Sequence, residues 1–556
     1  MRRWKTSFAT AGLVVAAASA HVAAQDADGG YPIDDPVIVA ACSSCHAQDD
    51  EGRLSRISWL RKTPEGWQTS LVRMMALHGV DVGAEDARAI VGYLANEQGL
   101  APEELRPGLF EVERRMIDHD YEGDSGVEFT CIQCHSMGRV ITQRRTKDEW
   151  ALLLATHRAL YPLVDFQAFR LGSTRGEQRH PMDEAIDHLA ETFPLETPEW
   201  SAWSATKRSP RLAGEWALRG YERGKGPIYG RVTITADPTD PDAFTTRASY
   251  VFTESGERVQ RTGQTVVYTG YQWRGRSNAG SDSQLREVML VERDLRTISG
   301  RWFTGAYDEF GPDVTLERIG SGPVLSGVYP SAVPRGAAST VTLYGSNLLD
   351  AADDLDFGEG VTVEAVTSRD EASVTLRIRV APDARIGQRD LYAGIATLEG
   401  AVVVHDGVDR IEVTPRAGMA RTGGASFPQG FETFEAIGYD DGPDGEPDTE
   451  DDLSLGRVDA TWRIEEYAAT YGDDDVDFVG RMLQDGTFSP AADGPNPERS
   501  GNRNNVGDVW VVATHRNTSG EEISARAQLV VTIPLYMRFD PWPSPGDVRL
   551  PVGDQP

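Results

Sequence analysis

The stretch that decides the fold is Ala41-Cys42-Ser43-Ser44-Cys45-His46, which has a counterpart in Thr130-Cys131-Ile132-Gln133-Cys134-His135. Both contain Cys-x-x-Cys-His, the spacing used for covalent attachment of c-type haem. In such a site two thiols add to the vinyl groups of the porphyrin, and the adjacent histidine becomes the proximal ligand of the iron. The chain has four cysteines, and all of them fall in these two motifs. The sequence therefore predicts two covalently bound haem c groups, held by Cys42, Cys45 and His46 and by Cys131, Cys134 and His135.

Two other uses of paired cysteines fit the sequence less well. A zinc site built from two Cys-x-x-Cys pairs would not require a histidine after each pair. A dithiol redox pair needs a thioredoxin-like βαβ context, which the sequence around the motifs does not show.

The residues around the motifs form a module that occurs twice. Thr63 to Trp67 follows the first motif, Thr146 to Trp150 follows the second, and an apolar helical segment comes after each. Each copy then closes with an amphipathic helix, at residues 85–95 and 183–190. This order is typical of small cytochrome c domains, so we expect residues 25–210 to form an all-α tandem dihaem domain.

The repeat also predicts the sixth iron ligands. Met74 follows Trp67 by seven residues, as His157 follows Trp150. Because seven residues make about two helical turns, each lies on the same helical face as its tryptophan. The expected pairs are His46/Met74 and His135/His157, with Met75 and His78 as rivals in the first copy and Met137 and Met182 in the second. Neither iron would keep an open position, which favours electron transfer over oxygen or peroxide chemistry.

The rest of the chain has the alternating apolar pattern of β-strands, punctuated by glycine and proline. We expect an antiparallel β-barrel at residues 211–320, an immunoglobulin-like domain at 321–406, a C-terminal β-sandwich at 407–540 and a tail at 541–556. The predicted fold class is thus multidomain, with an all-α tandem cytochrome c domain followed by three all-β domains. No phosphate loop, nucleophile elbow or zinc-peptidase motif occurs in a credible context, so no catalytic residue is assigned.

An acidic segment at residues 440–452 alternates carboxylates with glycines. Such segments can bind calcium, but this one does not fit the twelve-residue EF-hand spacing, so a solvated turn is predicted.

Net charge and the N-terminus indicate where the protein works. The formal charge of -31 disfavours nucleic acid and anionic membranes and would attract a basic patch on a redox partner. A salty habitat would select the same charge. Residues 1–24 read as a secretory signal peptide that ends at Ala20 or Ala24, and no later segment has the apolar length of a membrane span. We therefore expect a periplasmic protein, because c-type haem is attached outside the bacterial cytoplasm.

The order of these segments resembles that of the alpha subunit of quinohemoprotein amine dehydrogenase. The strings that carry the resemblance are longer than the haem motifs. Beyond Cys42-Ser43-Ser44-Cys45-His46, they are Arg56-Ile57-Ser58, Leu60-Arg61-Lys62-Thr63-Pro64-Glu65-Gly66-Trp67 and Ser500-Gly501-Asn502-Arg503-Asn504-Asn505-Val506-Gly507-Asp508-Val509-Trp510-Val511-Val512-Ala513-Thr514.

The resemblance implies a heterotrimer in which primary amines are oxidised to aldehydes and ammonia. In that family a small γ subunit carries a cysteine tryptophylquinone, and a β-propeller β subunit packs beside it. The alpha subunit then carries electrons through two haems to a soluble acceptor such as a cupredoxin or a cytochrome c. The quinone would lie on another chain, because the cysteines here are committed to haem. The alternative is a free-standing dihaem c-type peroxidase or redox protein with β binding modules.

Overall fold

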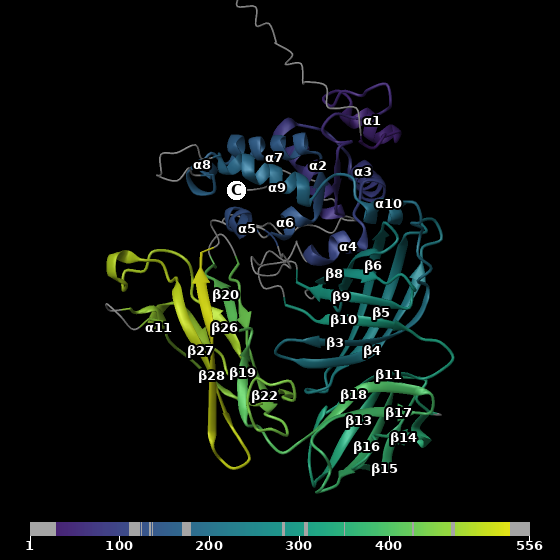
Figure 1. Ribbon diagram of the computed structural model, residues 1–556, viewed down its shortest axis with the longest axis vertical. Helices are drawn as coiled ribbons and strands as arrows, with labels where there is room; N and C mark the ends of the chain where they lie inside the picture. The colour runs from purple at the N-terminus through teal and green to yellow at the C-terminus, as the bar shows by residue number, and fades with distance from the viewer. Residues whose placement is uncertain are drawn as a thin grey trace, which may run out of the picture.

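The computed structural model describes residues 29–109, 123, 125–132, 135, 137–169, 179–280, 284–304, 310–349, 351–424, 428–468 and 473–533. The expected signal peptide, the expected tail and Cys134 lie outside these residues. A helical N-terminal region sits above a barrel, an immunoglobulin-like domain lies below the barrel, and the C-terminal domain stands beside both (Figure 1). None of the helices in the described part of the chain has the length and hydrophobicity needed to cross a bilayer.

The N-terminal region consists of short helices and one small sheet. Its elements are α1 (Pro36–Cys42), β1 (Leu60–Lys62), α2 (Pro64–His78), α3 (Ala84–Glu97), α4 (Pro102–Leu105), α5 (Ser125–Ile132), α6 (Gly138–Ile141), β2 (Gln143–Arg145), α7 (Lys147–Leu160), α8 (Val164–Gln167), α9 (Pro181–Thr192) and α10 (Pro198–Ser204).

The prediction of an all-α N-terminal domain in the fold class is wrong. Strands β1 and β2 pair antiparallel, with Arg61 opposite Arg144, and join the two copies of the module. Each strand is three residues long, too short to show an alternating pattern. Their central residues are also buried cations, which a hydrophobicity pattern places outside: Arg61 is 0 % and Arg144 is 7 % exposed. The carboxylate of Glu104 makes this burial possible, because it binds Arg61 at 2.8 Å and Arg144 at 3.1 Å.

The two copies share their local contacts. Thr63 caps α2 by accepting from the Gly66 amide at 3.1 Å, and Thr146 caps α7 by accepting from the Glu149 amide at 3.3 Å. The indole Nε1 of Trp67 donates to the Gln98 carbonyl at 3.1 Å. That of Trp150 donates to the Phe193 carbonyl at 3.2 Å. Each tryptophan therefore ties its helix to the end of the closing helix of its own module.

Residues 214–318 form a closed eight-stranded antiparallel barrel in the strand order β10-β3-β4-β5-β6-β7-β8-β9. Its strands are β3 (Gly214–Glu222), β4 (Gly226–Ala236), β5 (Ala243–Phe252), β6 (Arg258–Tyr268), β7 (Gln272–Asn278), β8 (Gln284–Val291), β9 (Thr297–Phe303) and β10 (Asp313–Arg318).

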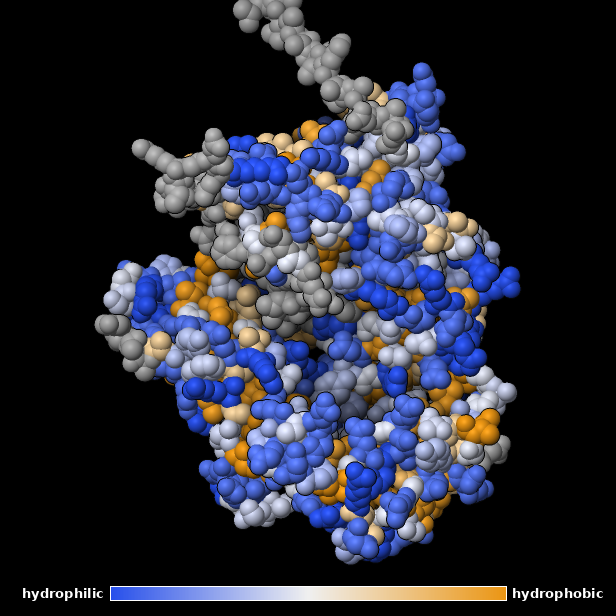
Figure 2. Space-filling view, viewed as in Figure 1, coloured by the Kyte–Doolittle hydropathy of each residue, from blue (hydrophilic) through white to orange (hydrophobic). Residues whose placement is uncertain are grey.

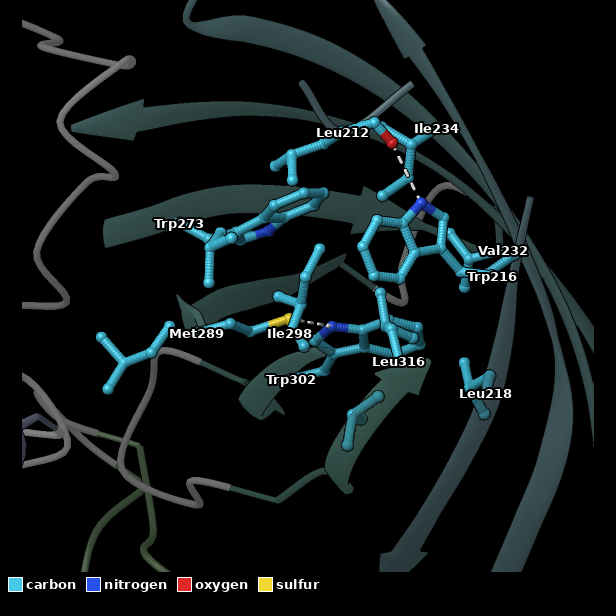
Figure 3. Close-up of a cluster of buried hydrophobic side chains, with 14 of the residues drawn as sticks. Leu212, Trp216, Leu218, Val232, Ile234, Trp273, Met289, Ile298, Trp302 and Leu316 are labelled. Carbon is cyan, nitrogen blue, oxygen red and sulfur yellow. Dashed lines mark hydrogen bonds between the residues drawn. The ribbon is translucent and has the colours of Figure 1, made fainter. Parts of the chain in front are cut away.

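Large side chains fill the barrel core (Figure 3). Trp216, Trp273 and Trp302 are each at most 3 % exposed. The Trp216 indole donates to the Leu212 carbonyl at 3.0 Å, and the Trp302 indole lies 3.3 Å from the Met289 sulfur. Because the indole N–H groups have partners, burial of the rings leaves no unsatisfied hydrogen-bond donor at these positions.

Gly230 lets strands β4 and β5 approach each other closely. A Cβ at this position would lie 2.1 Å from the Ser249 carbonyl oxygen and 2.6 Å from the Tyr250 Cα. We expect Gly230→Ala to lower the free energy of unfolding by about 1–3 kcal/mol, because backbone atoms have to move apart. Urea denaturation followed by tryptophan fluorescence measures this. Gly320→Ala is the control, since nothing lies within 4 Å of its Cβ position, and equal midpoints for the two variants would contradict the prediction.

The immunoglobulin-like domain packs two four-stranded sheets, β11-β13-β16-β15 and β12-β18-β17-β14. Its strands are β11 (Val324–Tyr329), β12 (Ala332–Pro334), β13 (Ala338–Ser346), β14 (Leu355–Asp356), β15 (Val361–Arg369), β16 (Ser373–Val380), β17 (Gly387–Ala393) and β18 (Ala396–His405).

The C-terminal domain combines a four-stranded sheet, β20-β28-β27-β24, with two three-stranded sheets, β19-β22-β23 and β21-β26-β25. Its elements are β19 (Arg410–Thr414), β20 (Ala417–Arg421), β21 (Glu432–Thr433), β22 (Glu435–Asp440), β23 (Leu453–Arg457), β24 (Thr461–Glu466), α11 (Asp475–Phe478), β25 (Gly480–Met482), β26 (Thr487–Pro490), β27 (Gly507–Arg516) and β28 (Glu522–Thr532).

The barrel contacts each of the other domains. Arg274 on β7 binds Glu65 of α2 at 2.5 Å, with both side chains almost fully buried. Tyr229 stacks on Tyr344 of the immunoglobulin-like domain with ring centroids 4.7 Å apart. Glu435 of the C-terminal domain accepts from the hydroxyl group of Tyr221 at 2.9 Å. Hydrophilic side chains cover most of the outer face in view (Figure 2).

Candidate functional site

The first Cys-x-x-Cys-His motif begins at the end of helix α1. Asp35 caps this helix by accepting from the amides of Val37 and Ile38. The helix ends at Cys42, and the His46 amide donates to the Cys42 carbonyl at 2.9 Å. The motif therefore continues the helical winding for one further turn.

His46 has the arrangement of a metal-binding histidine. Its Nδ1 lies 2.7 Å from the Ser55 carbonyl oxygen. A carbonyl only accepts, so Nδ1 carries the proton and Nε2 is left as the electron-pair donor. Burial lowers the pKa of His46, which favours the neutral form that binds metals.

The two thiols of this motif differ in exposure. Cys42 is half-buried, Cys45 is exposed, and neither forms a disulfide. Burial, and then the neighbouring Cys45, raises the pKa of the Cys42 thiol. Both thiols are free of a disulfide, as the precursors of thioether bonds would be.

Helix α2 carries the predicted sixth ligand of the first module. Met74 is half-buried, on the helical face that also presents the buried Trp67 and Leu71. The rival Met75 packs against the hydrophobic core of this module, as Cys42 does. The rival His78 is exposed at the end of the helix. Met74 as the ligand therefore stays a prediction, with Met75 as its nearest competitor.

The structure brings the second predicted histidine pair together. His135 follows helix α5, which contains Cys131, and His157 lies on α7. Their ring centroids are 6.3 Å apart. Nδ1 of His157 lies 2.9 Å from the Leu153 carbonyl oxygen, one helical turn back, so Nε2 is again the available donor. Burial lowers the pKa of His157 and favours the neutral ring.

A cavity of about 220 Å³ lies at these two histidines. The thiol of Cys131 lies at its wall, together with apolar side chains of the second module. The apolar lining residues include Val140, Trp150, Leu153, Leu154, Val164, Phe169 and Leu189. The rival ligands do not line it: Met137 is buried in the hydrophobic core, and the Met182 sulfur lies 4.0 Å from the Arg158 guanidinium.

The residues present fit a haem at this cavity. Two imidazoles that bind one metal through bonds of about 2 Å have ring centres roughly 6 Å apart, close to the observed separation of His135 and His157. The thiol, the two ring nitrogens and the apolar wall are the donors and the surroundings that a covalently attached haem needs.

Charged side chains form part of the cavity wall, and the haem motifs gave no indication of them. Lys62 and Arg73 come from the first module, and Arg145 comes from β2. The available signal was the repeat itself, since Lys62 and Arg145 occupy equivalent positions directly before Thr63 and Thr146.

The acidic segment at 440–452 is held by a cation of the domain. Arg410 binds Asp441 at 2.8 Å and also pairs with Asp452. These contacts agree with a structural turn.

A duplicated helical module, a barrel and two further β domains define a multidomain protein with a candidate haem site in its N-terminal region. Four family models match the chain, and all describe parts of one protein. They are "Quinohemoprotein amine dehydrogenase A, alpha subunit, haem binding" at residues 33–200, and domains II, III and IV of the same alpha subunit at 209–319, 323–406 and 411–543. The chain belongs to the quinohemoprotein amine dehydrogenase alpha subunit family.

Other comparisons add little. No curated protein matches the chain. Among solved structures, a de novo designed fluorescence-activating β-barrel is 18 % identical over 19 % of this chain and 93 % of its own, with a TM-score of 0.16. A glucan-utilisation protein of Bacteroides ovatus, solved with a mixed-linkage heptasaccharide, is 12 % identical over 57 % of this chain and 60 % of its own, with a TM-score of 0.18. At these scores neither likeness supports a conclusion.

Proposed function

We propose that this chain is the electron-transfer subunit of a periplasmic amine dehydrogenase and carries two covalently attached haem c groups. Cys42, Cys45 and His46, with Met74, would hold the first. Cys131, Cys134 and His135, with His157, would hold the second. The observation that carries the proposal is the cavity that Cys131, His135 and His157 line together, with the two rings 6.3 Å apart.

The chain's own residues favour electron relay over substrate chemistry. Each haem, when bound, supplies a one-electron carrier. With both His135 and His157 holding the iron, no ligand position would be left for a peroxide or an amine. The cysteines are all committed to attachment, so the tryptophylquinone and the catalytic base belong on a partner subunit. Oxidation of a primary amine with water to an aldehyde and ammonia releases two electrons and two protons, and this chain takes the electrons.

Helix α2 is suited to lie between the two attachment sites. One face presents Trp67 and Leu71 to the core of the first module, and the opposite face, with Thr69 and Arg73, lines the cavity of the second. With a haem held by each module, α2 would lie between the two groups.

The proposed partners follow from the family and from charge. They are a small quinone-bearing γ subunit, a β-propeller β subunit, and a soluble cupredoxin or cytochrome c acceptor. The net charge of -31 would steer a basic surface of the acceptor toward this chain.

Purification of the tagged chain from its native periplasm tests the proposal. We expect a stoichiometric complex with two further subunits, of which the small one stains for a quinone. Mass spectrometry of this chain should show two covalently bound haem masses. An unrelated tagged periplasmic protein is the control. Recovery of the chain alone, or with fewer than two haems, would contradict the proposal, and high-spin haem in the isolated chain would favour a peroxidase.

A further inference from the structure

The cavity of the second module is completed by the first module. Its lining residues before the second motif are Lys62, Glu65, Gly66, Thr69, Ser70 and Arg73. These positions recur every three or four residues, so they form one face of helix α2 together with the last residue of β1. The second module therefore does not enclose its cavity by itself.

This shared wall carries unbalanced positive charge. Lys62 is 6 % exposed, and its Nζ donates to the Ser70 hydroxyl at 2.7 Å, a neutral partner. Among the described residues, no carboxylate forms an ion pair with Lys62 or with Arg73. Burial, followed by the charges of Arg145 and Arg73, lowers the pKa of Lys62 well below its usual range.

The carboxylates near the cavity are engaged elsewhere. Glu65 is bound by both Nε and Nη2 of Arg274, at 2.5 and 3.5 Å. Glu149 accepts from Nε of Arg56 at 3.0 Å on both oxygens, whereas Nη1 of Arg145 is 3.9 Å from it. Burial lowers the pKa of Arg145 to about 9. Among the described residues, the cavity lining thus has four cations, Lys62, Arg73, Arg145 and Arg139 of α6, and one carboxylate, Glu65, which is bound to Arg274.

Buried cations are costly unless an anion pairs with them. A porphyrin that is attached to cysteines through its vinyl groups carries two propionates at the opposite edge. We propose that Lys62 and Arg73 of the first module, together with Arg145, bind the propionate carboxylates of the haem that the second module attaches. This inference rests on the proposed function. The guanidinium groups can bind a carboxylate through two parallel N–H groups, and Lys62 supplies a point charge.

In this arrangement, side chains of both modules would contact the second haem. The pairing of β1 with β2 fixes Lys62 opposite Gln143, two residues from Arg145. A second module separated from the first would attach a haem but would lack Lys62 and Arg73 at the propionates.

The test uses the full chain within its native complex. Arg73→Met and Lys62→Met each remove one charge and keep an unbranched side chain. We expect each to shift the ferric–ferrous equilibrium of the bis-histidine haem by about tenfold toward the ferric form, because a positive charge near the iron disfavours its oxidation. Spectroelectrochemical titration measures this shift, and the propionate deformation bands in resonance Raman spectra should move with it.

Lys147→Met is the matched control. Lys147 is exposed, pairs with Asp187 at 2.6 Å and does not line the cavity. It should leave the potential and the Raman bands unchanged, and Arg73→Lys should keep most of the wild-type potential.

Each result bears on a separate claim. If both haems are attached but Arg73→Met changes neither the potential nor the propionate bands, the inference fails and the proposed function stands. If no haem is attached at Cys131, the proposed function itself fails. Arg73 is half-buried at the cavity wall, so its variant remains informative even if Lys62→Met does not fold.

Discussion

Glu104→Gln is expected to lower the free energy of unfolding of the N-terminal region by about 3–5 kcal/mol, because it leaves two buried guanidinium groups without their counter-ion. Glu104 accepts from Arg61 at 2.8 and 2.9 Å, and Arg144 lies 3.1 Å away. It also accepts from the Thr197 hydroxyl at 2.8 Å and from the Ala101 amide at 2.8 Å. The Glu104 carboxylate therefore links β1 of the first module to β2 of the second. It also binds the segments that contain Ala101 and Thr197.

The pH dependence of this effect has a definite sign. Burial raises the pKa of Glu104, but the hydrogen bonds and charge of Arg61 outweigh it and hold the pKa below its ordinary value. A lowered pKa in the folded state means that the stabilisation is complete above the unfolded pKa of about 4.3 and is lost as the pH falls through the folded value. The difference between wild type and Glu104→Gln should therefore shrink below about pH 4.

Glu103→Gln is the control for this measurement. Glu103 pairs with Arg293 at 2.8 Å, but both side chains are at least half exposed, so its loss should cost less than about 1 kcal/mol. Urea denaturation with hydrogen exchange of residues 60–105 as the readout separates this region from the β domains. Equal destabilisation by the two variants would show that the buried cluster does not hold the modules together.

His157→Ala is expected to convert one of the two haems from low-spin to high-spin, because the iron loses its sixth ligand. The other haem should be unaffected, since it is attached at Cys42 and Cys45. Electron paramagnetic resonance and optical spectra of the full chain measure the change. Added imidazole should restore the low-spin signal, because the substitution leaves a space where Nε2 of His157 would have bound.

Two variants serve as controls for the ligand assignment. His188→Ala removes a histidine of α9 that does not line the cavity, and Met182→Leu removes the rival thioether. Both should leave the spectra of the two haems unchanged. If Met182→Leu abolished the low-spin signal and His157→Ala left the spectra unchanged, the sixth ligand would be Met182 and not His157.

Much of the candidate site could be read from local sequence. Cys-x-x-Cys-His places thiols and imidazole within one helical turn, so the order of residues alone gives their proximity. The seven-residue interval from Trp150 to His157 also follows from helix geometry, and the structure places His157 opposite His135. The same interval in the first copy selects the half-buried Met74, but the adjacent Met75 is the one that packs against the core.

The sequence by itself determined the family, the duplication and the residues that would attach haem, because these depend on covalent chemistry and on contacts between near neighbours. Tertiary structure decided how the two copies meet. The β1–β2 sheet, the buried cluster around Glu104 and the cationic wall of Lys62, Arg73 and Arg145 join residues that lie far apart in the chain. Buried charges carry no signal in a hydrophobic pattern, since their burial depends on a partner that only the folded chain supplies.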